Sequence, residues 1–287
     1  MQIISTSTST STALILGCLA LAWSAVASAA GTCPQHYAGG MQPVVTNPRL
    51  AVETHELCST NFAVLHSGVT RSPIYAAEHL TRVSLSDAKQ QVRVNTFRPD
   101  LRLPSEQRAE LRDYVRSGYD RGHLAPSGNM PTETAQDESF MLSNIVPQNA
   151  DNNRHLWSGI ESTTRLLGKR SGELYVVTGT IYSGSRLFTV GDRVAVPTHI
   201  YKALYDPKTG ESAAYIVRND ETPQFATVDL PTLQRLSGVR VFPGVRNLTR
   251  GIDLPGPFLR GAAANRYQRV SYGALFTEQN IARHLGQ

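Results

Sequence analysis

Four consecutive residues, DRGH at positions 120–123, combine side chains that could hydrolyse a phosphodiester. The imidazole of His123 can accept a proton near neutral pH. The guanidinium of Arg121 can neutralise phosphate oxygens, and the carboxylate of Asp120 can orient a neighbour or hold a metal-bound water. Such a reaction also needs something to stabilise the departing oxygen, commonly a divalent ion. The tetrapeptide therefore supplies a base and part of the positive charge, but not the ion.

Oxygen-bearing side chains that could bind an ion follow further along the chain. They are Asn144, Gln148, Asn149, Asn153 and Glu161. No second histidine stands at metal spacing, and oxygen ligands of this kind favour a hard cation. We therefore expect Mg²⁺, with Mn²⁺ able to substitute.

The spacing of Asn153 and Glu161 indicates how they would share one ion. On a predicted helix from about residue 151 to 167, their Cα atoms lie about 12 Å apart along the axis and about 80° apart around it. Both side chains can hardly bind one ion directly. We expect the Asn153 amide to contact the metal and Glu161 to reach only its waters, which suits Mg²⁺ because this ion keeps several waters.

These motifs together resemble the DNA/RNA non-specific endonucleases of the Serratia nuclease and mitochondrial endonuclease G type. The shared pattern is DRGH, then Asn-x-x-Pro-Gln, then an Asn, then a Trp and a Glu at four-residue steps. In this chain the later part is SNIVPQNADNNRHLWSGIE, with Asn144, Pro147, Gln148, Asn153, Trp157 and Glu161 at the matching positions. The ordered combination is specific, and the resemblance covers residues from about 61 to 243.

The resemblance implies a ββα-metal (His-Me finger) core in which a hairpin and a helix hold one Mg²⁺. On the matching positions His123 becomes the general base, and Asn153 becomes the direct ligand of the metal. Glu161 would act on metal-bound water, while Asp120 would have an orienting role and Arg121 would face the phosphate.

Three assignments around this core stay open or secondary. The family has a further arginine upstream of DRGH, and both Arg93 and Arg98 fit it loosely; we include Arg98 in the candidate set without excluding Arg93. Asn152 would replace Asn153 as the ligand if the helix register slipped by one residue, although the Trp and Glu spacing favours Asn153. Asn144 and Gln148 are expected to support the site.

The remaining chain predicts one α+β domain with a mixed, mainly antiparallel sheet. Strand patterns cover residues 61–67, 72–85, 173–182 and two segments around the turn at 206–210, while short helices are expected from about residue 105, from 231 and near 277–285. We see no internal repeat or linker. Residues 31–287 are therefore taken as a single domain with a family-like core at about 61–243.

The first thirty residues predict a secretory signal peptide. An apolar stretch at 13–23 is followed by small residues that fit a cleavage site near Ala29 or Ala30, although no basic residue precedes it. The stretch is too short for a membrane span, which needs roughly twenty residues. We therefore expect an exported protein, periplasmic or extracellular, without a membrane span in its mature form. The two remaining cysteines, Cys33 and Cys58, predict one disulfide, with two unrelated thiols as the alternative.

The formal net charge of +5 points to a polyanionic partner. Of the 28 basic residues only four are lysines, and the many arginines suit phosphate, although a GC-rich genome would also explain them. We expect an exported Mg²⁺-dependent endonuclease that cleaves DNA and RNA with little sequence preference and that could form a homodimer. The alternatives are a non-catalytic polyanion-binding protein and a phosphodiesterase for small substrates.

Overall fold

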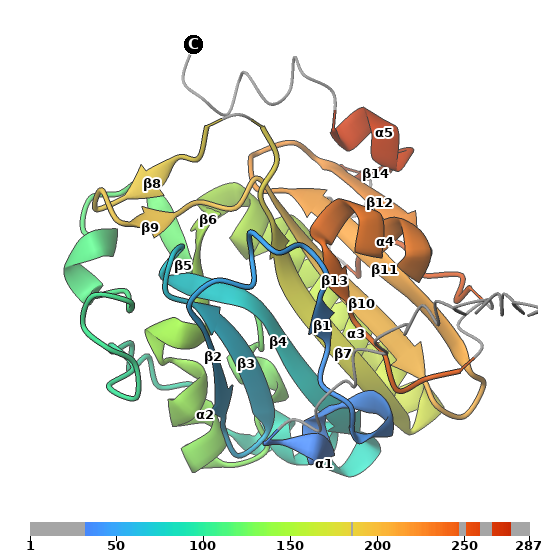
Figure 1. The fold of residues 1–287 in the computed structure, drawn as a ribbon. Helices are drawn as coiled ribbons and strands as arrows, with labels where there is room; N and C mark the ends of the chain where they lie inside the picture. Colours follow the sequence, from blue (N-terminus) through green and yellow to red (C-terminus); the bar gives the residue numbers. More distant parts are fainter. Residues whose placement is uncertain (1–31, 185, 247–250, 259–265, 277–287) are drawn as a thin grey trace, which may run out of the picture.

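A large β-sheet forms the centre of the computed structural model, which describes residues 32–184, 186–246, 251–258 and 266–276 (Figure 1). Its strand order is β14-β12-β11-β10-β7-β4-β3-β2. The strands are β2 (Thr54–Cys58), β3 (Phe62–Ser67), β4 (Ser72–Thr81), β7 (Glu173–Ile181), β10 (His199–Asp206), β11 (Glu211–Arg218), β12 (Gln224–Val228) and β14 (Gln268–Arg269). All neighbours pair antiparallel except β12 and β14. The prediction of an α+β fold with a mixed, mainly antiparallel sheet is confirmed.

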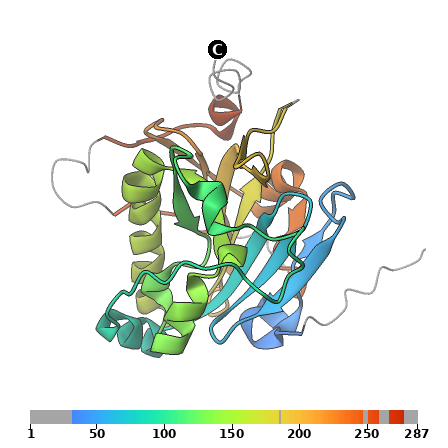
Figure 2. The ribbon, with the colours of Figure 1, turned by 90° about the vertical axis from the view of Figure 1, so that its left-hand side faces the viewer.

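Both faces of this sheet are buried, and alternate residues of a strand enter different cores. In β11, Tyr215 and Val217 belong to one cluster, whereas Ala214 and Ile216 belong to the other. The first cluster includes residues of α1 (Arg82–Asp87) and α3 (Ser158–Ser171), and the second includes residues of α4 (Leu230–Ser237). Figure 2 shows α3 and α4 on opposite sides of the sheet. Burial on both faces explains why these strands read as nearly continuous apolar runs.

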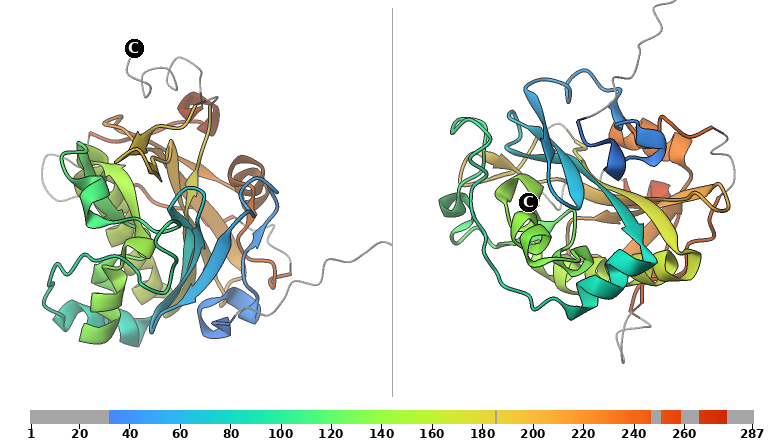
Figure 3. Two further views of the ribbon diagram at one scale, coloured as in Figure 1. Left: turned by 60° about the vertical axis from the view of Figure 1, so that its left-hand side comes forward. Right: turned by 90° about the horizontal axis from the view of Figure 1, so that it is seen from below.

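The scaffold of the predicted site is a hairpin followed by a helix. The strands β5 (Tyr119–His123) and β6 (Ile145–Asn149) pair antiparallel, and a π-helical segment at Asn152–Trp157 leads directly into α3. Along the sequence, α2 (Glu133–Ser139) lies between these two strands. Figure 3 shows the hairpin, α2 and α3 on the same side of the large sheet. This is the ββα arrangement that the resemblance implied.

Smaller elements complete the fold. Two short antiparallel pairs are β1 (Val44–Val45) with β13 (Val239–Arg240) and β8 (Thr189–Val190) with β9 (Val194–Ala195), and α5 (Tyr272–Leu275) precedes the last described residue. Among the described helices, none combines the length and apolar character that a membrane crossing requires. The division into a signal peptide and one domain stays a prediction, and residues 1–30 and 277–285, with their predicted signal and helix, lie outside the described residues.

The sequence misjudged two helices near the site. The helix expected from Ser105 is reduced to one 3₁₀ turn at Leu111–Tyr114. The side chain of Arg193 donates to the Arg108 carbonyl over 3.1 Å and so holds this part of the backbone in a non-helical path. The long helix continues past Gly168 and ends at Ser171. Gly172 follows with φ of 100°, the left-handed conformation that glycine adopts at little cost.

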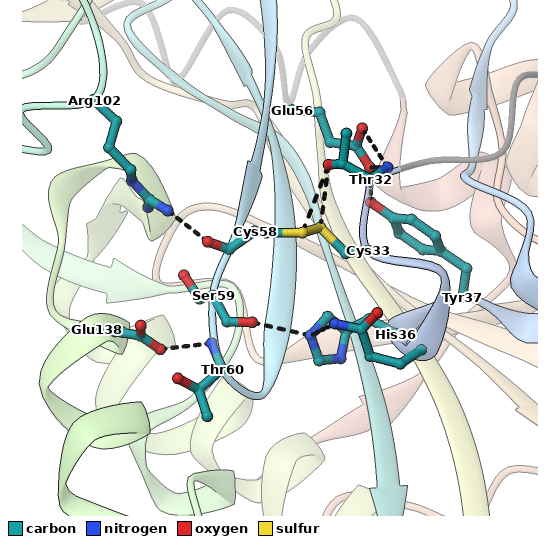
Figure 4. Close-up of a disulfide and its surroundings, with 11 residues drawn as sticks. Thr32, Cys33, His36, Tyr37, Glu56, Cys58, Ser59, Thr60, Arg102 and Glu138 are labelled. Carbon is teal, nitrogen blue, oxygen red and sulfur yellow. Dashed lines mark hydrogen bonds between the residues drawn. A yellow bond between two sulfur atoms is a disulfide. The ribbon is translucent and has the colours of Figure 1, made fainter.

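A disulfide joins Cys33 to Cys58 and thereby ties the N-terminal segment to the end of β2. The two Cα atoms are 5.8 Å apart. Beside it, Glu56 accepts hydrogen bonds from the Thr32 amide and from the Tyr37 hydroxyl, the latter over 2.7 Å (Figure 4). The predicted pairing of the two cysteines is therefore present in the structure, and it fixes the segment that covers the α4 face of the sheet.

Candidate active site

A polar pocket of about 710 Å³ lies between the β5–β6 hairpin, the loop before it and the start of α3. Its lining brings together five residues of the predicted site, which are Asp120, Arg121, His123, Asn153 and Glu161. Arg93, Arg154 and Arg165 also line it. Residues separated by more than seventy positions in the sequence therefore meet around one cavity, and arginines outnumber acids in it.

His123 ends β5 and is almost fully buried, yet it borders the pocket. Its ring packs against Phe97 and Phe140, with centroids 5.5 and 4.9 Å away. Its Nε2 atom has no hydrogen-bond partner in the described part of the chain. Burial, together with the charge of Arg93, lowers the pKa of His123 to about 3. The imidazole is therefore neutral at physiological pH and able to accept a proton.

Two amide side chains hold the backbone around His123. Asn144 is buried and bonds both the amide and the carbonyl of Ala125, over 3.0 and 2.9 Å. Gln148 lies across the hairpin, and a Cβ atom at Gly122 would come within 2.0 Å of its Oε1 atom. The glycine of DRGH is thus needed because Gln148 occupies the space beside it. Both predicted supporting residues lie next to the site without lining the pocket.

Asp120 fixes the amide of Asn153. Asn153 Nδ2 donates to Asp120 Oδ2 over 3.0 Å, and Arg154 donates to both oxygens of Asp120 over 2.9 and 2.7 Å. Burial would raise the pKa of Asp120, but the hydrogen bonds from Arg154 and Asn153 outweigh it and lower that pKa overall. Asp120 is therefore a carboxylate at neutral pH, and it leaves the Oδ1 atom of Asn153 without a partner among the described residues.

The structure distinguishes Asn153 from Asn152, which the sequence left open as the alternative metal ligand. Asn152 is buried and donates from Nδ2 to the Arg218 carbonyl over 2.8 Å, while its Oδ1 atom accepts from Gln148. Asn153 instead lines the pocket together with Glu161. The intervening π-helical stretch departs from the 100° step of an α-helix, so the offset expected for a regular helix does not apply.

Of the two upstream arginines, the structure places Arg93 in the pocket and Arg98 outside it. Arg98 forms a bidentate ion pair with Asp137, over 2.9 and 2.5 Å. Arg93 lines the pocket and donates to Ser127 Oγ over 3.1 Å. Arg98 was included in the candidate set, but its guanidinium binds Asp137 of α2 and does not line the pocket, whereas Arg93 does.

Sequence reasoning missed Arg165 and the buried residues behind it. Arg165 lies one helical turn after Glu161, and its Nη1 donates to Asn129 Oδ1 over 3.2 Å. Asn129 in turn donates to Glu78 Oε1 over 2.9 Å. Glu78 lies on the α3 face of β4. A series of hydrogen bonds therefore links the large sheet to the pocket. The spacing from Glu161 could have revealed Arg165, because residues four apart share a helix face.

A buried lysine completes the charge beneath the pocket. Lys202 on β10 has no exposed surface, bonds the Thr178 hydroxyl and lies 5.3 Å from the centroid of the Trp157 ring. Burial raises the pKa of Glu78 to about 7, opposed by the charge of Lys202. Burial also raises the pKa of Glu161, opposed by Arg165 and Lys202. In the sequence, these buried charges could have been recognised because Glu78 and Lys202 each stand within a mainly apolar strand pattern.

The family model of DNA/RNA non-specific endonucleases matches residues 45–248. The chain belongs to the DNA/RNA non-specific endonuclease family. The family prediction is confirmed, and the members of this family are metal-dependent nucleases.

Among its relatives, the mitochondrial nuclease EXOG of Homo sapiens is 34% identical over 212 residues, which are 66% of this chain and 57% of that protein. The mitochondrial endonuclease G of Caenorhabditis elegans is 32% identical over 212 residues, 67% of this chain and 68% of that protein. A chain in the crystal structure of the EndoG/EndoGI complex has a TM-score of 0.60 and 27% identity, covering 69% of this chain and 90% of that chain. The chain thus spans less than two thirds of the human relative.

The predicted export is contradicted by these relatives, which are mitochondrial nucleases. The prediction depended on an apolar segment preceded by serines and threonines, without acidic residues. Mitochondrial leaders share its richness in serine and its lack of acidic residues, but they are also rich in arginine, which this segment lacks. Because the relatives are mitochondrial, the periplasmic or extracellular location is withdrawn.

The donor groups of the pocket fit the metal that the family implies. In the described ranges no three His, Cys, Asp or Glu side chains cluster as a metal-binding group, so the protein offers few direct ligands. The free Oδ1 of Asn153 and the nearby carboxylate of Glu161 are hard oxygen donors. Such a sparse oxygen set suits a cation that retains most of its waters.

Proposed function

We propose that this protein is a Mg²⁺-dependent endonuclease that hydrolyses phosphodiester bonds in DNA and RNA with little sequence preference. One observation carries the proposal: a buried, neutral His123 lines the same pocket as Asn153 and the three arginines that do not bind Asp120, which are Arg93, Arg121 and Arg165. His123 accepts the proton of the attacking water. Burial is the main cause of the low pKa of His123, and a bound phosphate would relieve the smaller cause by offsetting the charge of Arg93, which shifts that pKa upward.

The amide end of the pocket would hold the cation. Asn153 offers its Oδ1 atom as the direct ligand, because Asp120 binds its Nδ2 atom and sets the orientation of the amide. Glu161 would accept hydrogen bonds from the waters of the cation. When bound, Mg²⁺ supplies positive charge that stabilises the departing oxygen.

Three arginines would bind the phosphate. The guanidinium of Arg121 lies over the Phe97 ring at 4.3 Å, which fixes its plane, and Arg93 and Arg165 line the same pocket. Arg154 is occupied by Asp120 and is not assigned this role. Contacts to phosphate carry no direct sequence information, so binding of this kind supports cleavage with little sequence preference.

Incubation of the purified protein with supercoiled plasmid and with RNA, with Mg²⁺ or with EDTA, tests the proposal. We expect cleavage of both polymers in Mg²⁺, loss of cleavage in EDTA, and weaker binding at high salt as phosphate contacts are screened. Binding without cleavage would favour the polyanion-binding alternative. Cleavage of a small chromogenic diester without cleavage of either polymer would favour the small-substrate phosphodiesterase. The homodimer stays a prediction, which sedimentation equilibrium would test.

The assignment of Arg93 has its own test, with Arg98 as the matched comparison. Replacement of Arg93 by alanine removes a charge from the pocket, and we expect kcat/KM to fall about 100-fold with little change in stability. Replacement of Arg98 breaks the ion pair with Asp137 instead. Its activity at a temperature where it is folded should therefore stay close to wild type. The reverse result would restore Arg98 to the site.

A further inference from the structure

A second cavity, of about 220 Å³, adjoins the candidate active site. It is lined by Leu111, Tyr114, Val115, Tyr119, Asp120 and Arg121. The last two residues also line the larger pocket. The two cavities therefore meet at the residues that begin DRGH, and a ligand bound at Arg121 could extend into both.

Four of the six residues that line this second cavity are aliphatic or aromatic, while Asp120 and Arg121 add polar surface. The side chain of Val115 is 67% exposed and that of Leu111 is 39% exposed. Phe188 is also exposed, and its ring centroid is 6.3 Å from that of Tyr119. Single exposed apolar residues are ordinary, but several that gather beside a basic pocket indicate a ligand surface.

Tyr114 is the second aromatic residue of the lining. Its side chain is 7% exposed and its hydroxyl has no hydrogen-bond partner in the described parts of the chain. Because the hydroxyl oxygen is itself buried, Tyr114 lines the cavity through its other atoms. The cavity thus combines two tyrosines and two aliphatic residues with Arg121, which also lines the larger pocket.

We propose that this cavity binds one nucleobase of the substrate, next to the phosphate held at Arg121. The inference rests on the proposed endonuclease function. A base has two flat faces and a covalent link to a phosphate, which matches the tyrosines of the lining and the Arg121 that this cavity shares with the larger pocket. The volume lies below the roughly 300–1,000 Å³ of sites for drug-sized ligands, so it suits a single base. Stacking on an aromatic side chain accepts every base, which agrees with weak sequence preference.

The proposal has a consequence for the form of the substrate. A base that enters the cavity must leave its stack, and this step costs free energy in a duplex but little in a single strand. We therefore expect a lower KM for single-stranded DNA and RNA than for duplex DNA of the same length. The sugar takes no part in this recognition.

The direct test uses the wild-type protein in Mg²⁺ and single-stranded oligonucleotides with one cleavable phosphodiester among uncharged methylphosphonate linkages. An abasic nucleotide is placed on the 5′ side or on the 3′ side of that bond. We expect one of the two abasic substrates to raise KM about tenfold, since stacking of one base is lost, and the other to leave KM unchanged. Unchanged KM for both would overturn the base-binding cavity while cleavage of the intact oligonucleotide upheld the endonuclease. No cleavage of any oligonucleotide would overturn both.

Two variants of one residue connect this effect to the cavity. In Tyr119→Ala the ratio of KM between abasic and intact substrates should fall to about one, because the stacking surface is gone. In Tyr119→Phe the ratio should stay near the wild-type value. A general structural defect would change both substrates alike and leave the ratio intact. A wild-type ratio in Tyr119→Ala would therefore overturn the assignment.

Discussion

The two faces of the large sheet are covered by different kinds of buried side chains. The cluster on the α4 side consists of apolar residues, tyrosines and Cys33, and the buried His199 stacks on Phe276 at its edge. On the α3 side, the fully buried Glu78 and Lys202 interrupt the apolar cluster beneath the candidate active site. Buried charges are costly and often add no stability, whereas apolar packing stabilises directly. The difference indicates that the α4 face supports the fold and that the charges of the α3 face serve the pocket.

Removal of one buried charge should give the largest loss of stability. Lys202→Met leaves Glu78 without its opposite charge, and we expect the free energy of unfolding to fall by about 4 kcal/mol. Urea denaturation at pH 7 measures it. The double variant Lys202→Met/Glu78→Gln should recover part of the loss, because neither charge then remains. A single variant as stable as the wild type would remove the distinction between the faces.

A substitution that creates a cavity in the α4 face should destabilise the protein without affecting catalysis. Leu233 of α4 is fully buried, and Leu233→Ala should lower the free energy of unfolding by about 3 kcal/mol. Because its cluster does not touch the pocket, kcat on plasmid DNA at a temperature where the variant is folded should match the wild type. A large fall in kcat with an intact fold would show that both faces serve the site.

The smallest expected effect is a pH dependence confined to the α3 face. The pKa of Glu78 is raised to about 7 in the folded state, above its ordinary value of 4.5. Its contribution to stability is therefore fully present below pH 4.5 and is lost as pH rises through 7. Between pH 7 and pH 5 the wild type should gain about 2 kcal/mol relative to Glu78→Gln. Urea denaturation of both proteins at several pH values measures this difference, and a constant difference would contradict the assignment.

The sequence predicted the parts of the site that lie close together along the chain. DRGH forms one strand of the hairpin, and the segment of residues 143–161 forms the second strand and the start of the helix. Asn153 and Glu161 lie on one continuous helical segment and both line the pocket, although the π-helical stretch changes the angle between them from that of a regular helix. The sheet was also predictable, since β-branched apolar runs with intervening turns form strands.

The parts that the sequence could not give depend on contacts between distant segments. Arg93 and Arg98 are equivalent by spacing, and only the position of Asp137 on α2 decides which of them is occupied. Glu78 and Lys202 belong to strands separated by β7, so their proximity follows from strand order and register. A 3₁₀ turn at Leu111–Tyr114 replaced the expected helix, because Arg193 from a distant segment binds the carbonyl of Arg108 just before it.

Replacement of His123 tests the central claim most directly. His123→Ala removes the proposed base, and kcat/KM on supercoiled plasmid in Mg²⁺ should fall by at least about 100-fold while the circular dichroism spectrum is retained. His155→Ala is the matched control, because His155 lies on the helical segment that carries Asn153 but does not line the pocket, and its half-exposed side chain is 3.8 Å from Asp151. The account predicts near wild-type kcat/KM for this control. A His123→Ala variant that cleaved plasmid within a few-fold of the wild-type rate would contradict the assignment of His123 as the base.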